Sequence, residues 1–193
     1  PFTLKGRAAH LLSGLVFDTL TVQSLDEPFA VYGLLAEDMA LAADGRSITF
    51  RLRPQARFNN GDPITADDVK YSFDTLRGKE ASPMFRQYWQ DVKRAVVIDR
   101  LTVRFDFERP NRELHMIVGS LPVFSRKWGQ GKPFDQIVTD DPIASGPYRV
   151  DRYDLGKSIS YVRNRDYWGN DLPMRRGTYN FDRVNVTYFL DEF

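Results

Sequence analysis

The sequence has 193 residues, of which 42% are hydrophobic and 27% are charged, so it belongs to the globular class with room for one substantial core or two small ones. Its 27 Lys and Arg residues balance 26 Asp and Glu residues, and the net charge of +1 provides no global field to attract nucleic acid or an anionic membrane. The lack of Cys excludes disulfides, thiolate metal sites and a cysteine nucleophile.

The first half of the chain predicts a helix, a strand and a second helix. Apolar residues recur at helical spacing from Ala8 to Leu20. Alternating apolar residues in Ser47–Arg53 predict a half-buried strand after a turn. Thr65 is a suitable N-cap for the next helix, and Asp68 stands at the capping-box position, so we interpret this acidic residue as structural.

The second half predicts a hairpin, a short helix and three more strands. The hairpin joins Ala95–Asp99 to Val103–Phe107, and Arg112–Val118 forms the short helix. A long stretch rich in Gly and Pro, Pro122–Pro147, is a candidate crossing between two lobes. The remaining strands are expected at Tyr148–Tyr153, Ile159–Arg163 and Val184–Leu190. Strands and helices without regular alternation indicate a mixed α/β or α+β arrangement.

The usual markers of catalysis are sparse. The two His residues, His10 and His115, stand alone, and the chain has no spacing typical of a metal site, so we expect no metal. Gly129–Lys132 resembles a phosphate-binding loop only superficially, because a proline follows it directly. Asp140 and Asp141 are adjacent residues before a proline, which favours a solvated loop over an acid and base pair.

Aromatic residues are plentiful, and most of them are expected in the core because large rings contribute heavily to burial. The segment Arg163–Trp168 mixes basic and aromatic residues, as a platform for single-stranded nucleic acid does. Its Asp166 and the neutral charge balance argue against nucleic-acid binding. We therefore expect no nucleic-acid partner.

Two blocks of sequence carry a resemblance to a known family. The first consists of Leu35–Met39, Asp44–Arg53 and Phe58–Val69, and the second of Ala144–Val150 and Tyr161–Gly169. In this order and spacing they resemble the family 5 extracellular solute-binding proteins. In addition, Arg175–Asp182 and Pro1–Gly6 are similar to the branch that imports peptides and peptide-like microcins.

The resemblance implies a mixed α/β (α+β) fold, namely a lobe like that of type II periplasmic binding proteins with an inserted accessory domain. It implies that residues 1–34 form the first part of ligand-binding lobe I, that 35–142 form the accessory domain, and that 143–193 return to lobe I. The second large lobe of the family is missing from this sequence. We therefore expect a truncated piece of a longer chain.

The function that the resemblance implies is capture of a short peptide or peptide-like solute without catalysis, metal or cofactor, and its delivery to an ABC permease in the inner membrane. The implied location is the periplasm, and we expect a monomer. The loop before the first helix would lie beside the ligand backbone, and an aromatic loop at Met84–Tyr88 would lie near one end of the ligand. The implied ligand contacts are Phe2, Thr3, Leu4, Lys5, Gly6, Phe85 and Tyr88. The aromatic members are equally compatible with a place in the core.

Other interpretations stay open at this point. A hydrolase could act through a carboxylate pair drawn from Asp140, Asp141 and Asp166, and a pure interaction domain would have no ligand cleft at all. Within the binding class, an oligosaccharide or a nickel chelate could replace the peptide. Because lobes of this kind close around a ligand by hinge motion, we expect the 193 residues alone to bind peptides weakly or not at all.

Overall fold

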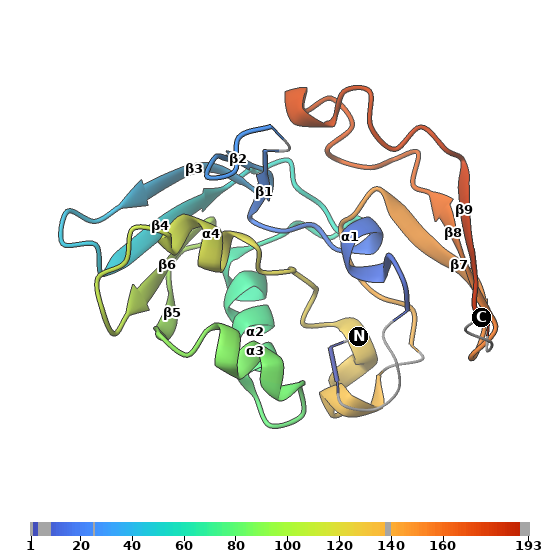
Figure 1. Cartoon of the computed structure of the whole chain (residues 1–193), viewed down its shortest axis with the longest axis horizontal. Helices are drawn as coiled ribbons and strands as arrows, with labels where there is room; N and C mark the ends of the chain where they lie inside the picture. Colours follow the sequence, from blue (N-terminus) through green and yellow to red (C-terminus); the bar gives the residue numbers. More distant parts are fainter. Residues whose placement is uncertain (1, 4–8, 25, 138–139, 190–193) are drawn as a thin grey trace.

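The computed structural model describes residues 2–3, 9–24, 26–137 and 140–189, which form three antiparallel sheets connected by short helices (Figure 1). A two-stranded ribbon pairs β1 (Thr21–Gln23) with β2 (Val31–Gly33). A four-stranded sheet has the order β3-β4-β6-β5, and a three-stranded sheet has the order β7-β8-β9. The combination of antiparallel sheets with separate helices agrees with the expected α+β class.

The four-stranded sheet contains β3 (Ala36–Leu41), β4 (Ser47–Leu52), β5 (Val92–Asp99) and β6 (Thr102–Phe107). The predicted strand and hairpin are both confirmed, because every second side chain of β4 and β6 is buried. The helix α2 (Ala66–Arg77) packs on this buried face. There the rings of Phe73 and Phe105 meet edge to face with centroids 5.4 Å apart.

The start of α2 has the predicted cap. The carboxylate of Asp68 accepts hydrogen bonds from the backbone N–H of Thr65 at 3.0 Å and from its hydroxyl at 2.8 Å. The bond to the backbone N–H satisfies a donor that the helix itself leaves unpaired. The structural interpretation of Asp68 is therefore confirmed.

The helix predicted from Ala8 to Leu20 is much shorter than expected. The helix α1 covers only Leu12–Val16, and Ala8 lies outside the described residues. Leu11 has a left-handed backbone with φ of 64°, and the helix ends where Phe17 becomes extended. Phe17 and Leu20 are buried although neither lies in a helix, so the apolar spacing that resembled one long helix belongs partly to non-helical backbone.

The remaining helices are short. The segment expected to be an aromatic loop is the helix α3 (Pro83–Tyr88), and α4 covers Leu114–Gly119, close to its predicted range. Single 3₁₀ turns are η1 (Trp128–Gly131), η2 (Phe134–Gln136) and η3 (Pro173–Arg175). As predicted, the region rich in Gly and Pro is largely irregular.

The three-stranded sheet consists of β7 (Tyr148–Asp154), β8 (Ser158–Arg163) and β9 (Arg183–Thr187). All three strands lie close to their predicted positions. In β9, Val184 and Val186 are half-buried on one face, as expected, whereas the predicted end at Leu190 lies outside the described residues.

The buried apolar side chains form one continuous cluster. It contains Leu20, Phe105 and Tyr161, and so draws on all three of the segments expected from the sequence. The boundaries at residues 34 and 142 consequently remain a prediction, since the core passes across them.

The junction between α1 and β7 depends on close backbone approach at Gly146. Its N–H donates to the carbonyl of Val16 at 2.8 Å. A Cβ at this position would lie 2.5 Å from the carbonyl oxygen of Leu15 and from the carbonyl carbon of Val16. Only glycine fits there without moving backbone.

We predict that Gly146→Ala lowers the free energy of unfolding by about 1–3 kcal/mol, the usual cost of overpacking a rigid site. The matched control is Gly14→Ala in α1, where an added Cβ meets nothing within 4 Å. That control should be neutral or stabilising by about 0.5–1 kcal/mol. Urea unfolding of both variants measures the difference, and equal stabilities would contradict the role assigned to Gly146.

Candidate functional site

The structure brings together the N-terminal segment and α3, the two regions predicted to contact a ligand. The carbonyl of Phe2 accepts the N–H of Ser82 at 2.9 Å, and Thr3 forms an antiparallel bridge with Ala81. The rings of Phe2 and Phe85 have centroids 6.0 Å apart. These residues form a single surface, which we call the wall: Phe2, Thr3 and Ala81–Tyr88. The predicted contacts Leu4, Lys5 and Gly6 lie outside the described residues.

The side chain of Phe2 belongs to the core. It is 3% exposed, and its ring meets those of Phe17, Phe124 and Phe134 at centroid distances of 5.0, 5.8 and 6.4 Å. Aromatic rings packed in this way stabilise both partners beyond simple burial. The Phe2 ring therefore anchors this end of the wall in the core.

The helix α3 presents a different surface. Met84 and Tyr88, one turn apart, are 63% and 55% exposed. Beneath them, Phe85 stacks on buried Trp89 with centroids 5.6 Å apart, and the Trp89 indole N–H donates to the carbonyl of Ile117 at 3.0 Å. The two exposed side chains thus stand on a fixed aromatic base.

A pocket of about 410 Å³ adjoins the wall. It is lined by the end of α2, by Gly78–Glu80 and by Gly131–Phe134. The carboxylate of Glu80 accepts the N–H of Phe134 at 2.7 Å, which fixes one side of the pocket. Lys79 and Lys132 supply positive charge, and the ammonium of Lys132 lies 2.9 Å from a carboxylate oxygen of Asp140.

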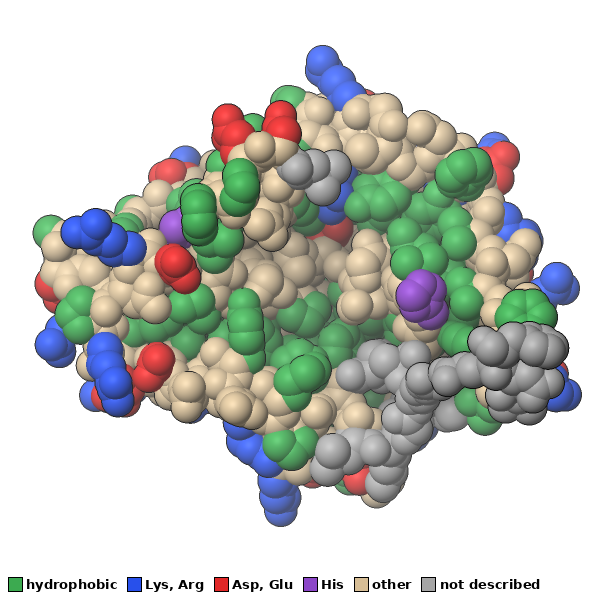
Figure 2. Space-filling model, viewed as in Figure 1, with side chains coloured by type: hydrophobic (Ala, Val, Ile, Leu, Met, Phe, Trp, Pro, Cys, Tyr) green, Lys and Arg blue, Asp and Glu red, His purple; other side chains and the backbone are tan. Residues whose placement is uncertain are grey.

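Figure 2 shows the face of the molecule seen in Figure 1. Hydrophobic side chains gather across the middle of this face, where the surface is hollowed, and charged side chains lie mostly around its rim. Such a distribution is typical of surfaces that bind other molecules.

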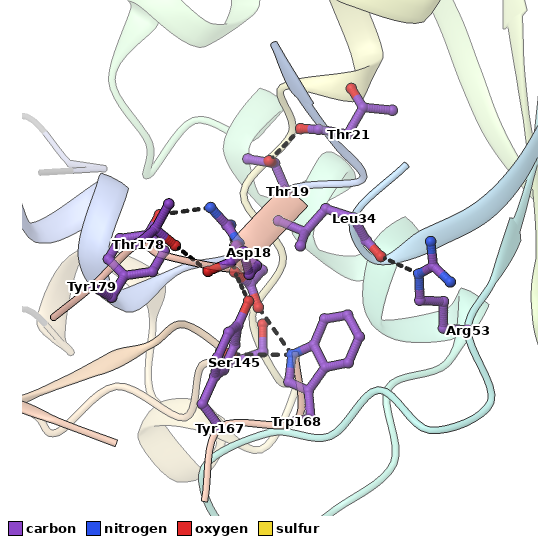
Figure 3. A network of polar contacts seen from close by, with 11 residues as sticks. Asp18, Thr19, Thr21, Leu34, Arg53, Ser145, Tyr167, Trp168, Thr178 and Tyr179 are labelled. Atoms are coloured by element: carbon purple, nitrogen blue, oxygen red, sulfur yellow. Dashed lines mark hydrogen bonds and ion pairs between the residues drawn. The ribbon is translucent and has the colours of Figure 1, made fainter. Parts of the chain in front are cut away.

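A buried polar network lies at the junction between α1 and β1 (Figure 3). Asp18 is buried, and its carboxylate accepts hydrogen bonds from the hydroxyl of Tyr167 at 3.1 Å and from the indole N–H of Trp168 at 2.9 Å. The guanidinium of Arg175 forms an ion pair with it at 3.4 Å. Segments about 150 residues apart in the sequence are joined at this one carboxylate.

The network extends from Arg175 to the three-stranded sheet. The guanidinium of Arg175 donates to the hydroxyl of Tyr179 at 2.6 Å and lies over its ring, 5.0 Å from the centroid. Tyr179 in turn contacts Tyr148 of β7 edge to face. Burial raises the pKa of Asp18 to about 6, although the charge of Arg175 acts in the opposite direction.

The sequence analysis missed this network. Tyr167 and Trp168 stood inside a block that resembles the family, but no role was assigned to them, and Asp18 was not singled out. A signal was present, because Asp18 is a carboxylate within a mainly apolar run that ends at Leu20. A buried carboxylate requires hydrogen-bond donors, so this position already indicated that donors for it lie elsewhere in the chain.

The carboxylates considered for hydrolysis have ordinary environments. Asp140 is paired with Lys132, and Asp141 and Asp166 are exposed. Asp141 lines a second pocket of about 380 Å³ together with Arg149 of β7. General acids and bases are usually tuned by burial, whereas Asp141 and Asp166 are exposed and Asp140 is only partly buried.

Among the described residues, no group of three or more His, Asp or Glu side chains is close enough to hold a metal ion. No helix in the described part of the chain is long and apolar enough to cross a membrane.

Residues 30–192 match the sequence model of a family described as "Bacterial extracellular solute-binding proteins, family 5 Middle". A putative binding protein of Brucella melitensis is 38% identical over 183 residues, which are 92% of this chain and 29% of that protein. The probable peptide-binding protein YejA of Agrobacterium fabrum is 38% identical over 200 residues, covering 100% of this chain and 32% of YejA. The chain thus spans about a third of the length of the relatives it matches.

Solved structures give the same fold. The binding protein AgaA of A. tumefaciens in complex with agropinic acid superimposes with a TM-score of 0.74 at 21% identity, covering 92% of this chain and 34% of AgaA. DppA of Helicobacter pylori in complex with the peptide STSA superimposes with a TM-score of 0.68 at 21% identity, covering 84% of this chain and 36% of DppA. The expected type of lobe is therefore confirmed.

The raised pKa of Asp18 predicts a specific pH dependence of stability. A folded-state pKa of about 6, above the unfolded value of about 3.9, means that the folded protein holds this proton more tightly. Its stabilising contribution is fully present below the unfolded pKa and is lost as the pH rises through 6. The stability of the wild type relative to Asp18→Asn should therefore increase by about 1 kcal/mol between pH 7 and pH 5.

Urea unfolding at the two pH values tests this. Asp166→Asn is the matched control, because it removes one exposed carboxylate by the same substitution. A constant difference between the wild type and Asp18→Asn across this range would show that the buried carboxylate does not titrate there.

Proposed function

The chain belongs to family 5 of the bacterial extracellular solute-binding proteins, and we propose that it forms one wall of the cleft in which a longer protein captures short peptides. The observation that carries this proposal is the wall itself, in which the main chain of Phe2 and Thr3 is held against Ala81 and Ser82 beside an exposed aromatic helix. Extended main chain of this kind can form a ladder of hydrogen bonds with a peptide whatever its side chains.

The proposed ligand contacts divide by chemistry. Thr3 and the neighbouring residues Leu4, Lys5 and Gly6 contribute main chain, whereas Tyr88 contributes an exposed ring for the ligand's side chains. Phe2 and Phe85 belong to the same set, but their rings support the wall from beneath. The neighbouring lysines Lys79 and Lys132 suit a ligand carboxylate.

The relatives support a peptide as ligand. YejA of A. fabrum is named a probable peptide-binding protein, and the structure of DppA contains the peptide STSA. In our proposal, capture involves no chemistry, takes place in the periplasm, and ends with delivery to an ABC permease in the inner membrane. The divisions at residues 34 and 142 are part of the same proposal, with 35–142 as an accessory domain.

A second candidate is a small anionic solute. The solved structure of AgaA contains agropinic acid, and the pocket beside the wall carries two lysines. Binding of such a ligand would depend on Lys79 and Lys132 and little on Tyr88. The two candidates therefore differ in which substitution weakens binding.

We predict that Tyr88→Ala in the full-length protein raises the Kd for a bound short peptide by about 5–30-fold, the effect of losing one aromatic contact of about 1–2 kcal/mol. Isothermal titration with a panel of short peptides measures this. Tyr153→Ala is the matched control, because Tyr153 of β7 is 44% exposed and lies outside the wall. Equal affinities of Tyr88→Ala and the wild type would argue against a role for α3.

We also predict that residues 1–193 alone bind the same peptides weakly or not at all, because closure of a cleft requires two lobes. Titration of this chain beside the full-length protein tests the expectation. Micromolar affinity of the isolated chain would contradict it.

A further inference from the structure

A second pocket, of about 380 Å³, lies where the end of α1 meets the three-stranded sheet. Its lining comes from Val16, from Asn59, from residues 141–143 and from the strands β7 and β8. It shares no lining residue with the wall or with the pocket beside the wall. Because its volume is at the lower end of the usual range for small-molecule sites, it suits a solute much smaller than an extended peptide.

The apolar side of this pocket is held in place by the surrounding backbone. Val16 is 1% exposed, and its carbonyl accepts the N–H of Gly146 at 2.8 Å. The backbone N–H of Asn59 donates to the carbonyl of Ala144 at 2.8 Å, and its side-chain amide donates to that of Pro142 at 2.9 Å. The segments around the pocket are thus hydrogen-bonded to one another, as is usual for a preformed site.

The strand β7 brings a cation to the pocket. Arg149 lies opposite Val162 of β8, so the two side chains are on the same face of the sheet. The register shift in β7 falls at Asp151, which also lines the pocket, but the carboxylate of Asp151 is neutralised by an ion pair with Arg183 of β9. Arg149, in contrast, has no hydrogen-bond or ion-pair partner among the described side chains.

A charge of the opposite sign lines the same pocket. Asp141 also has no such partner in the described part of the chain, although the preceding Asp140 pairs with Lys132. The side-chain carbonyl of Asn59 accepts no hydrogen bond from any residue that the structure describes. One unpaired surface charge is common because water solvates it, whereas two of opposite sign around an apolar pocket are complementary to a solute that carries both charges.

We propose that this pocket binds a free amino acid with an apolar side chain, such as leucine, at a site separate from the proposed peptide cleft. The guanidinium of Arg149 binds the carboxylate of the amino acid, and the carboxylate of Asp141 and the side-chain carbonyl of Asn59 accept hydrogen bonds from its ammonium group. The apolar side chain lies against Val16 and Val162. Every group involved belongs to this chain, so the proposal is independent of which ligand the cleft captures.

Titration of the full-length protein with leucine and two analogues tests the proposal without any substitution. Isopentylamine lacks the carboxylate of leucine, and 4-methylpentanoate lacks its amino group. We expect leucine to bind and each analogue to bind at least about 10-fold more weakly, because each has lost a charge-assisted contact. Absence of leucine binding at millimolar concentration, or equal binding of the three compounds, would overturn the proposal.

Two substitutions in β7 locate the site. We expect Arg149→Gln to raise the Kd for leucine by about 10–100-fold, the usual effect of losing a hydrogen-bonded charge. Arg152→Gln is the matched control, because Arg152 is an exposed residue of the same strand that does not line the pocket, and its Kd should stay within about 2-fold of the wild type. Equal affinities of the two variants would contradict the assignment of Arg149.

The variant Tyr88→Ala separates this site from the peptide cleft. We expect it to leave the affinity for leucine unchanged, because Tyr88 belongs to the wall and not to this pocket. Loss of leucine binding in Tyr88→Ala, with binding retained in Arg149→Gln, would show that leucine occupies the cleft and would overturn the second site. Titration with peptides remains a separate readout, so failure of peptide binding alone leaves this result unaffected.

Discussion

A single buried carboxylate, that of Asp18, joins segments from the first and last parts of the described chain. Removing Asp18 from water is unfavourable unless donors replace the lost solvation, and these come from Tyr167, Trp168 and Arg175. Because those donors lie far along the chain, satisfying Asp18 fixes the last third of the sequence against the first. The close approach of Gly146 to the end of α1 lies beside this network, because the carbonyl of the neighbouring Ser145 accepts the indole N–H of Trp168 at 3.2 Å.

A second constraint, the aromatic cluster around Phe2, separates support from recognition within the wall. The rings of Phe2 and Phe85 are used in packing, so they fix the position of the main chain and of α3. In the proposed cleft, the exposed side chains of Met84 and Tyr88 meet the ligand. This division suits a protein that accepts peptides of varied sequence, because the main-chain contacts are constant and the side-chain contacts are adaptable.

Local patterns in the sequence predicted local structure well. The alternation in Ser47–Arg53 and the cap at Thr65 were correct because both depend on neighbours within a few residues. The prediction for α1 was wrong because the apolar residues after Val16 pack from non-helical backbone, which periodicity alone cannot distinguish from helix. The partners of Asp18 could not be predicted from local patterns, because they become adjacent to it only after folding. The pairing of Thr3 with Ala81 was not predicted, because no local rule joins such distant segments. The family resemblance implied only that Phe2–Gly6 and Met84–Tyr88 lie beside the same ligand.

The charges of the pocket beside the wall limit what the proposed site can recognise alone. A free peptide carries a positive amino terminus and a negative carboxyl terminus, and both ends must be matched when they leave water. In the proposed cleft, Lys79 and Lys132, which also pairs with Asp140, meet the negative end of the peptide. The carboxylate of Glu80 already accepts the N–H of Phe134, so in this proposal an acidic group from the facing side of the cleft meets the positive end. The proposed wall would then orient a peptide along its main chain, while the opposite side determines its direction.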